Sequence, residues 1–588
     1  MLTRQPENTT DFPYLAFIPN TSFSMKYFSL FLLLTCFFTT QAQEQVYFNA
    51  KIFTANPQQP YADALAVEGK TIVAVGNYEQ VKAKVGGQAE WIDLQGGFVM
   101  PGLVDSHNHG IDGGMGLTKA NVNDLFLDVN QIHQFALETL TKKEGLTGDV
   151  LVIYGLNIST WKALDRVIKL FNSGEFKTQP VFLRGSDWHT AWANKAMLKR
   201  AGVTKAYLAS LTGDEKKYFG VAADGESNGF VSEDGQHKIE EVLEPDTDFS
   251  LGAIKAMEYN NGFGITAFLD PSAARLPGPH DNMLAWYQRL EQQGQLTAHI
   301  AATVVAEVNA DPHPQMAAVK ALQQQYNGNN LQVLGFKVFA DGVVEHPTHT
   351  AALSLPYTGT KSKGVMMMDP EKFARFATLA DNENLLVHVH AIGDQAVTET
   401  LNGFEAMRKA NKSMALPHTI THLQFVQPAD FDRFASLNVL ASFQLLWALG
   451  DETTIDIVKP YVDPSIYQWM YPVRSMLQAG ATICGASDWP VSTANPFEAM
   501  YYAETRKGAL SVLDSTQRMP RQAMLLAYTA EAAKALMLEH SIGSLQIGKS
   551  ADFILLDRDV ETVSPESLKA TQVLWTMFEG KKVYEAGK

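Results

Sequence analysis

Two histidines separated by one residue, His107 and His109, stand at the end of an apolar run near the start of the chain. Side chains at positions i and i+2 of a β-strand point to the same side, so both imidazoles can reach one metal ion. A His-x-His pair is common by chance. Its meaning therefore depends on whether other ligand residues end similar runs elsewhere in the chain.

Three further candidate ligands do end apolar runs. His390 ends one within HVHAIGD, His422 ends the next within TITHLQF, and Asp488 ends a later one within GASDWP. Together the four imidazoles and one carboxylate form a ligand set typical of zinc or a similar divalent ion. If the runs are strands of one barrel, their carboxyl ends converge and bring these side chains to a single site.

Eight short apolar runs, most followed by helix-like stretches, indicate the scaffold. Several are almost continuously apolar, as expected of strands buried on both faces. The runs are 97–107, 264–270, 297–306, 334–342, 384–394, 418–423, 439–447 and 481–490. Helices are expected between them, for example at 371–383 and 428–437. These units predict the α/β fold class, as a (β/α)8 TIM-like barrel.

The segments outside the runs predict two further parts. Residues 43–97 and 540–588 carry short strand-like patterns, and we expect the two chain ends to form one small β-sandwich. The barrel is expected over 98–539. The stretch at about 110–260 is too long for a single crossover, so it predicts an inserted subdomain after the first barrel strand, covering the barrel mouth.

The N-terminus predicts an export signal. An apolar run at 27–38 follows a lysine and precedes small and polar residues up to Ala42, which is typical of a secretory signal peptide and too short to span a bilayer comfortably. We expect residues 1–42 to be removed, with Met25 as the true start. Cleavage as a lipoprotein at Cys36 and a buried N-terminal helix are the alternatives. The mature protein would be periplasmic or secreted, without stable membrane insertion.

Composition narrows the class of partner. The chain of 588 residues is 46% hydrophobic and 19% charged, which is ordinary for a globular protein with a large core. Its formal net charge of −16 argues against nucleic acid or an anionic membrane as a partner, because both repel it. Without the signal segment Cys484 is the one cysteine left, so no internal disulfide can form. The expected partner is a small-molecule substrate.

These motifs resemble the amidohydrolase superfamily, and specifically its amidohydrolase-3 (YtcJ-like) branch of metal-dependent hydrolases. The resemblance runs from about residue 45 to 585 and includes several individually specific segments, among them HAIGD, SDWPV and GSLQIGKSADF. The matching segments are MPGLVDSHNH, DWHTAWANKAML, FKVFADGVVE, HVHAIGDQAV, THLQFVQPADFDRF, GASDWPV and IGSLQIGKSADFILLD.

The resemblance implies the metal ligands. His107 and His109 would bind the buried metal ion, while His390 and His422 would bind a second ion or a shared site. Asp488 would lie at the metal-bound water. The implied cofactor is one or two divalent ions, with zinc as the expected metal.

The resemblance also implies roles for three other residues. Lys337 matches a lysine that is carboxylated in related enzymes and bridges two metals; the alternative is an ammonium group paired with Asp341 or Asp488. A free ammonium cannot bind a metal, whereas a carbamate offers two oxygens. His189 and Asn194 match the motif of the insert and would reach the substrate, although an imidazole in an insert is as often a structural group.

The predicted activity is hydrolysis of a non-peptide carbon–nitrogen bond by a metal-activated hydroxide, in a linear or cyclic amide. Asp488 would orient the water, accept its proton and deliver it to the leaving amine. The resemblance includes N-substituted formamide deformylases. The alternatives are ester or lactone hydrolysis or decarboxylation at the same metal site, and a periplasmic binding protein without catalysis. The family is also compatible with a homo-oligomer.

Overall fold

The computed structural model describes residues 44–143, 145–244, 248–276 and 282–587. The predicted signal segment and its alternatives, including Cys36, lie outside the described residues. Within the described ranges, no helix is both long enough and apolar enough to cross a membrane.

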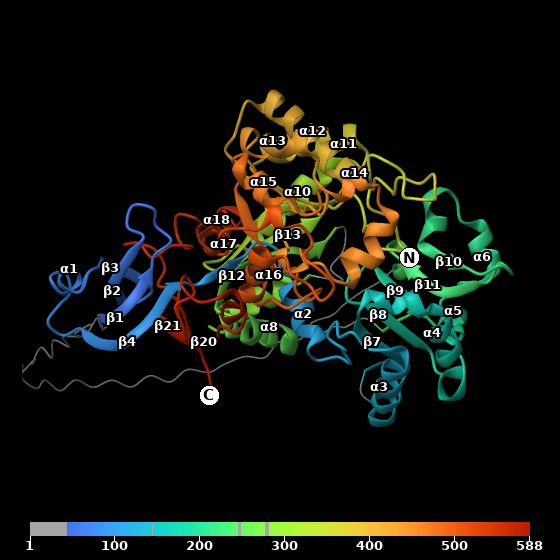
Figure 1. The fold of residues 1–588 in the computed structure, drawn as a ribbon, viewed down its shortest axis with the longest axis horizontal. Helices are drawn as coiled ribbons and strands as arrows, with labels where there is room; N and C mark the ends of the chain where they lie inside the picture. The colour runs from blue at the N-terminus through green and yellow to red at the C-terminus, as the bar shows by residue number, and fades with distance from the viewer. Residues whose placement is uncertain (1–43, 144, 245–247, 277–281, 588) are drawn as a thin grey trace, which may run out of the picture. The chain divides into compact units, whose positions relative to one another are not determined.

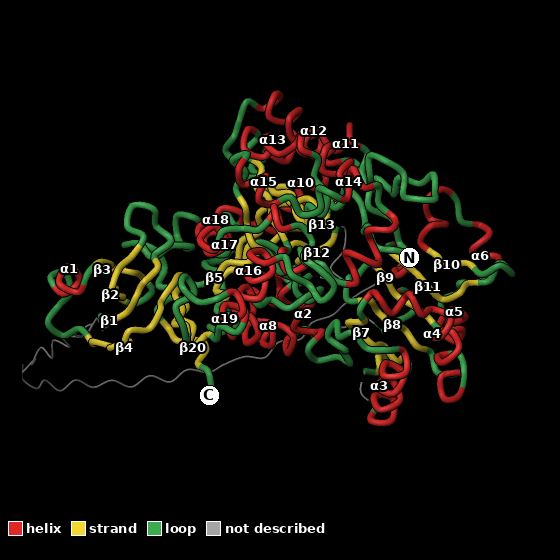
Figure 2. The backbone as a smooth tube through the Cα atoms, viewed as in Figure 1, coloured by secondary structure: helices red, strands yellow, loops and turns green. Residues whose placement is uncertain are grey.

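Eight parallel strands form the central sheet and follow one another in chain order. They lie in the middle of the molecule in Figures 1 and 2. They are β5 (Leu103–Asp105), β12 (Ile265–Arg275), β13 (His299–Val305), β14 (Leu331–Phe339), β15 (Leu386–Ala391), β16 (His418–His422), β17 (Val439–Phe443) and β18 (Ile483–Gly485). The two edge strands meet where the Ser106 amide donates to the Gly485 carbonyl at 3.0 Å. The predicted (β/α)8 barrel is therefore confirmed, and each predicted run supplies one strand.

Helices between the strands cover the outside of the barrel, and both helices predicted by range are present. Helix α11 (Pro370–Asn382) begins with proline, and the Asp369 side chain accepts from the Lys372 amide at 2.9 Å. Helix α13 (Phe431–Ser436) continues a short 3-10 turn. The other helices packed around the barrel are α9 (Leu284–Gln292), α10 (Pro312–Tyr326), α12 (Asp394–Asn411), α14 (Pro464–Tyr467), α15 (Val473–Gln478), α16 (Pro496–Thr505), α17 (Arg521–Ala527), α18 (Ala530–Ala535) and α19 (Pro565–Lys569).

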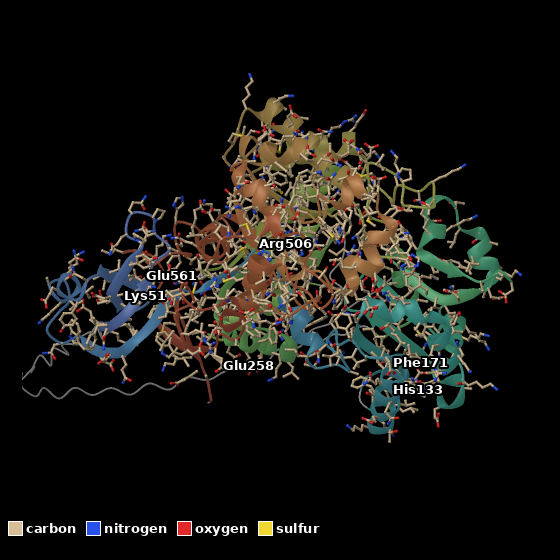
Figure 3. The ribbon with its side chains drawn as sticks, viewed as in Figure 1. Lys51, His133, Phe171, Glu258, Arg506 and Glu561 are labelled. Carbon is tan, nitrogen blue, oxygen red and sulfur yellow. The ribbon has the colours of Figure 1, made fainter. Side chains whose placement is uncertain are left out.

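Strands from both chain ends form a second sheet beside the barrel, as predicted. In sheet order its strands are β21 (Lys581–Glu585), β20 (Val573–Phe578), β19 (Phe553–Leu556), β4 (Glu90–Pro101), β1 (Gln45–Phe53), β2 (Tyr61–Glu68) and β3 (Thr71–Gly76). The rings of Tyr47 and Phe553 share its core with centroids 5.0 Å apart. Lys51 and Glu561, labelled in Figure 3, form an ion pair at 2.8 Å between the two chain ends. The sheet thus fixes the position of β4, which leads directly into the first barrel strand.

A third sheet belongs to the long insert between β5 and β12. In sheet order it contains β10 (Phe219–Val221), β11 (Ser227–Ser232), β9 (Thr190–Ala193), β8 (Val181–Gly185), β7 (Val150–Leu156) and β6 (Leu146–Thr147). Alternate residues of β7 enter two different cores, with Leu151 on one face and Val152 on the other, so helices cover both faces. These helices are α3 (Val129–Lys142), α4 (Leu164–Phe171), α5 (Lys195–Arg200), α6 (Lys205–Ser210) and α7 (Asp234–Glu240), while α2 (Gly110–Gly116) and α8 (Ser250–Gly262) join the insert to the barrel (Figure 1).

Candidate metal centre and active site

The predicted ligands from the first, sixth and eighth barrel strands do meet at one point. The Asp488 Oδ1 atom lies 3.2 Å from the Nε2 atom of His107 and 3.2 Å from the Nε2 atom of His109. The Asp488 Oδ2 atom lies 3.8 Å from the Nδ1 atom of His422. The carboxyl ends of the barrel strands lie at one end of the barrel, where β5 closes on β18 and only β17 separates β18 from β16, so residues distant in sequence converge.

The atoms around Asp488 fit a divalent metal ion. Asp488 is 6% exposed, and its Oδ1 atom has no hydrogen-bond partner although two imidazole nitrogens face it. Ligand atoms in tetrahedral coordination, about 2.0–2.2 Å from the ion, lie about 3.3–3.6 Å from one another, close to the 3.2, 3.2 and 3.8 Å found here. One ligand atom each from His107, His422 and Asp488 lie within 4.8 Å of one another. An orphaned buried carboxylate oxygen in this position fits a metal ligand.

Burial and the surrounding groups favour the neutral form of His107 and His422, whereas for His109 the contact with Asp488 outweighs burial and raises the pKa. Burial lowers the pKa of His107 well below its usual value, and the nearby Lys337 lowers it further. Burial and the neighbouring His390 do the same for the pKa of His422. Burial alone would raise the pKa of Asp488, but His109 and His422 hold it below its usual value. Neutral imidazoles and an ionised carboxylate are the forms that bind a metal.

The backbone at two of these residues is strained. Asp488 has a φ of 56° and His422 a φ of 77°, a region that residues with a Cβ atom rarely adopt. Such conformations cost on the order of 1–3 kcal/mol each and persist where the surrounding structure enforces them, often at functional sites. Here they turn both side chains toward the same point at the barrel mouth.

A second histidine orients His107. The His107 Nδ1 atom lies 2.7 Å from the Nε2 atom of His388, which is completely buried one level deeper in the barrel. If the His107 Nε2 atom binds the metal, its Nδ1 carries the hydrogen and donates to His388. The His388 Nδ1 atom then carries a hydrogen and has no partner within the described residues. His388 is therefore a positioning residue.

Hydrogen bonds to Asp105 connect the ends of the first and eighth barrel strands. Its carboxylate accepts hydrogen bonds from the His107 amide at 3.1 Å and the Asn108 side chain at 3.1 Å. It also accepts from the amide and hydroxyl of Ser487, at 3.0 and 2.5 Å. Asp105 was not among the predicted site residues, although it stands two positions before His107 within the matching segment MPGLVDSHNH. Asp105 holds the loops that carry His107 and Asp488.

Lys337 and His390 lie beside this cluster. Lys337 is 1% exposed, and burial lowers its pKa to about 7. Its Nζ atom lies 5.0 Å from the centroid of the Phe339 ring, and among the described residues it makes no ion pair with Asp341 or Asp488. The His390 Nε2 atom lies 3.1 Å from the Gly342 carbonyl oxygen, and burial lowers the pKa of His390. The ammonium ion pair considered as the alternative for Lys337 is thus absent.

His189 reaches the same region from the insert. Its ring centroid is 5.4 Å from that of His390, and its Nδ1 atom lies 2.7 Å from the Oε2 atom of Glu233. Burial alone would favour the neutral ring, but Glu233 raises the pKa of His189 to about 9. Glu233 accepts a further hydrogen bond from the Thr350 hydroxyl at 2.7 Å, and its φ is 45°. No sequence pattern pointed to Glu233, which lies 44 residues from His189.

Asn194 does not reach the substrate region, and the predicted substrate contact is wrong. The residue is fully buried, and its Oδ1 atom accepts from the Met197 amide at the start of α5. Its Nδ2 group donates to three main-chain carbonyl oxygens, those of Phe171, Phe176 and Gln179. All its hydrogen-bonding capacity is used inside the insert, so Asn194 holds the loop between α4 and β8.

One cavity contains the carboxylate and the insert histidine. It has a volume of about 250 Å³ and is lined by Asp488, His422, His390 and His189. The insert contributes the side of the wall that includes His189, so the predicted cover over the barrel mouth is part of the cavity. The aromatic walls come from Phe126, Trp447, Tyr471 and Tyr502.

Comparison with protein families agrees with this site. The family model described as the amidohydrolase family matches residues 90–584, which include every candidate ligand. The chain belongs to the amidohydrolase family. It is therefore a hydrolase that acts on carbon–nitrogen bonds and depends on a metal, as the motifs predict.

Individual relatives are similar over nearly the whole chain. The putative amidohydrolase YtcJ of Bacillus subtilis (strain 168) is 25% identical over 91% of this chain and 98% of its own. The N-substituted formamide deformylase of Arthrobacter pascens is 23% identical over 93% of this chain and 99% of its own. The crystal structure of an uncharacterised metal-dependent hydrolase from Pyrococcus horikoshii OT3 superposes with a TM-score of 0.67 at 23% identity, covering 89% of this chain and 99% of the other, and supports the fold.

Proposed function

We propose that this amidohydrolase cleaves the carbon–nitrogen bond of a small amide, an N-substituted formamide in the first instance. The observation that carries the proposal is the Asp488 Oδ1 atom, which is buried, lacks a hydrogen bond and faces two imidazole nitrogens at 3.2 Å. The cavity of about 250 Å³ beside it suits a small molecule. The choice of formamide rests on the distant deformylase relative, at 23% identity.

Different residues of this chain would perform different steps of such a hydrolysis. A divalent ion held by His107, His109, His422 and Asp488 would lower the pKa of a water molecule and polarise the substrate carbonyl. Asp488 orients that water, accepts its proton and later delivers the proton to the departing nitrogen. A carboxylate can do both because it is ionised before the attack and protonated after it.

His189 completes the site from the insert. Its Nδ1 atom is held by Glu233, which leaves Nε2 as the ring atom available to the cavity. In the protonated ring Nε2 carries a hydrogen, and it donates this to the substrate carbonyl oxygen as negative charge develops there. Glu233 holds the His189 ring in this orientation, and Thr350 holds Glu233 in turn, so the ring does not have to reorient during the reaction.

Lys337 and His390 are proposed to hold a second ion. A neutral lysine amine reacts with carbon dioxide to give a carbamate and a proton, and the carbamate oxygens are metal ligands. Burial without an ion-pair partner favours the neutral amine that this reaction needs, in agreement with the pKa of Lys337 of about 7. His390 would supply a further ligand once its ring turns from the Gly342 carbonyl.

The test measures metal content and turnover on the full chain purified without chelator. The wild type should hold one or two equivalents of metal. If it holds two, the metal content of Lys337→Ala should fall to one equivalent or fewer, even with bicarbonate present. Formate release from N-benzylformamide should stop on chelation, return with zinc, and fall at least about 10³-fold in Asp488→Asn, since that variant lacks the proton acceptor. A wild type without metal, or Asp488→Asn with full turnover, contradicts the proposal.

A further inference from the structure

The cavity beside the candidate metal centre has an unbalanced charge. Besides Asp488, five carboxylates line it, and no lysine or arginine does so among the described residues; the five are Asp124, Asp187, Glu345, Asp451 and Glu498. Glu498 is compensated by Lys569, whose Nζ atom lies 2.8 Å from its Oε1 atom. Arg506, labelled in Figure 3, is fully buried behind the wall and donates to the main-chain carbonyls of Met470 and Tyr471. It does not enter the cavity.

In three of these carboxylates, one oxygen accepts hydrogen bonds from neighbouring protein groups. Asp124 Oδ1 accepts from Ser186 and Asn157 at 2.7 and 2.9 Å. The Glu345 Oε1 atom accepts from the Gln424 side chain at 3.2 Å, and the Asp451 Oδ1 atom accepts from the Thr454 amide at 2.9 Å. Backbone amides also act on two of these carboxylates, that of Glu345 on its own side chain and that of Thr453 on Asp451. At least one oxygen of each carboxylate is therefore held in place, and all three side chains line the cavity.

The carboxylates also act on one another. Burial raises the pKa of Asp124 to about 6, and repulsion from Asp187 and Asp451 adds to the shift. Burial likewise raises the pKa of Glu345, with a contribution from Asp187, and that of Asp451. His189 lines the same cavity and lowers the pKa of Glu345 in part, but it is itself paired with Glu233, so the wall keeps an excess of negative charge. A cation inside the cavity would relieve this repulsion, whereas an anion would increase it.

Two further features mark this wall as part of the candidate active site. The unpartnered Asp488 Oδ1 atom, on a side chain that is more than nine-tenths buried, belongs to the same cavity. Aromatic faces line it as well, with the Trp447 ring stacked on His422 at a centroid distance of 6.0 Å. Aromatic faces together with carboxylates form the environment that binds ammonium groups in proteins.

We propose that the substrate carries a fixed positive charge, an ammonium or guanidinium group, which binds between Asp124, Glu345 and Asp451 while the reacting carbon–nitrogen bond lies at Asp488. The position of the reacting bond rests on the proposed function. The cation site itself does not, because it is defined by the three carboxylates and the aromatic wall. Binding and turnover can therefore be tested separately.

The binding test compares two molecules of the same shape. Choline and 3,3-dimethylbutan-1-ol differ only in that a quaternary nitrogen replaces a quaternary carbon, so their difference in affinity reports charge. Calorimetry on the zinc-loaded full chain should show choline binding at least about tenfold more tightly, with the preference reduced several-fold in Asp451→Asn and in Glu345→Gln. Equal affinities, or tighter binding of the alcohol, overturn the proposal.

A neighbouring carboxylate provides the matched control. Glu452 follows Asp451 directly but lies outside the cavity wall, and its Oε1 atom is 2.8 Å from the Nζ atom of Lys162. Glu452→Gln removes the same charge from the adjacent position and should leave the preference for choline unchanged. If Glu452→Gln weakens choline as much as Asp451→Asn does, the preference reflects the overall negative charge of the protein, and the proposed site is wrong.

The turnover test uses the corresponding formamides, those of (2-aminoethyl)trimethylammonium and of 3,3-dimethylbutylamine. We expect the cationic formamide to have a kcat/KM at least about tenfold higher, a ratio that falls as salt is added. Hydrolysis of both at equal kcat/KM overturns the cation proposal and leaves the amide hydrolase intact. Hydrolysis of neither, with choline still preferred, overturns the formamide assignment and supports the cation site.

Discussion

His422 at the end of a barrel strand and His189 of the insert line one cavity but lie in opposite electrostatic surroundings. His107 and His422 are buried near Lys337 and other imidazoles, and their pKa values are lowered. His189 has the Glu233 carboxylate at 2.7 Å, and its pKa is raised to about 9. The same side chain is thus held neutral on one side of the cavity and protonated on the other.

The difference follows from which elements supply the partners. The barrel brings together strand ends, and His107, His109 and His422 share the carboxylate of Asp488. The insert gives His189 a carboxylate of its own, and Thr350 from the barrel fixes that carboxylate in turn. Neutral imidazoles suit metal binding, whereas a protonated imidazole suits hydrogen-bond donation to a developing negative charge. We infer that the barrel holds the metal and the insert polarises the substrate.

Removing one histidine from each side should give the largest contrast. His422→Ala removes a ligand from the cluster around Asp488, and we expect metal content to fall below about half of the wild-type value and turnover to fall at least about 10³-fold. His189→Ala leaves all the candidate ligands in place, so it should keep full metal content while losing about 10–100-fold in kcat/KM. Plasma mass spectrometry and formate release measure both. Loss of metal in His189→Ala would contradict the division of roles.

A substitution with a smaller expected effect should bring the pKa of His189 closer to the lowered pKa values of His107 and His422. Glu233→Gln keeps the shape of the side chain but removes the charge that raises the pKa of His189, so the pKa should fall from about 9 toward or below its usual 6.5. His189 is protonated below its pKa, and activity that needs the proton is lost as pH rises through it. The alkaline limb of kcat/KM should therefore move to lower pH, with a loss of about tenfold at pH 8.

Thr350→Val provides the control for that shift. It removes the hydroxyl that donates to Glu233 but keeps the carboxylate charge, so the alkaline limb should move much less than in Glu233→Gln. Identical shifts in the two variants would show that orientation, and not charge, determines the behaviour of His189. An unmoved limb in Glu233→Gln would exclude His189 as the titrating group.

The sequence predicted the barrel side of the site far better than the insert side. Buried strands leave continuous apolar runs, and ligand residues at their ends are recognisable because barrel topology brings the ends together. The partner of His189, Glu233, lies between β11 and α7, and no period or spacing in the chain connects the two residues. The gathering of Asp124, Glu345 and Asp451 around one cavity depends on side-chain directions, which a sequence pattern does not specify.

Asn194 also shows that a sequence pattern does not specify side-chain contacts. Its motif was recognised, but its role was predicted wrongly. Its amide bonds three carbonyl oxygens and caps α5 inside the insert, so Asn194→Ala should lower the free energy of unfolding by about 3 kcal/mol through the lost cap and the unpaired buried groups. At a temperature where the variant is folded, KM and the pH profile should be unchanged. Denaturant unfolding and formate release measure the two effects. A raised KM at unchanged stability would return Asn194 to the substrate site and would mean that the insert reshapes itself when substrate binds.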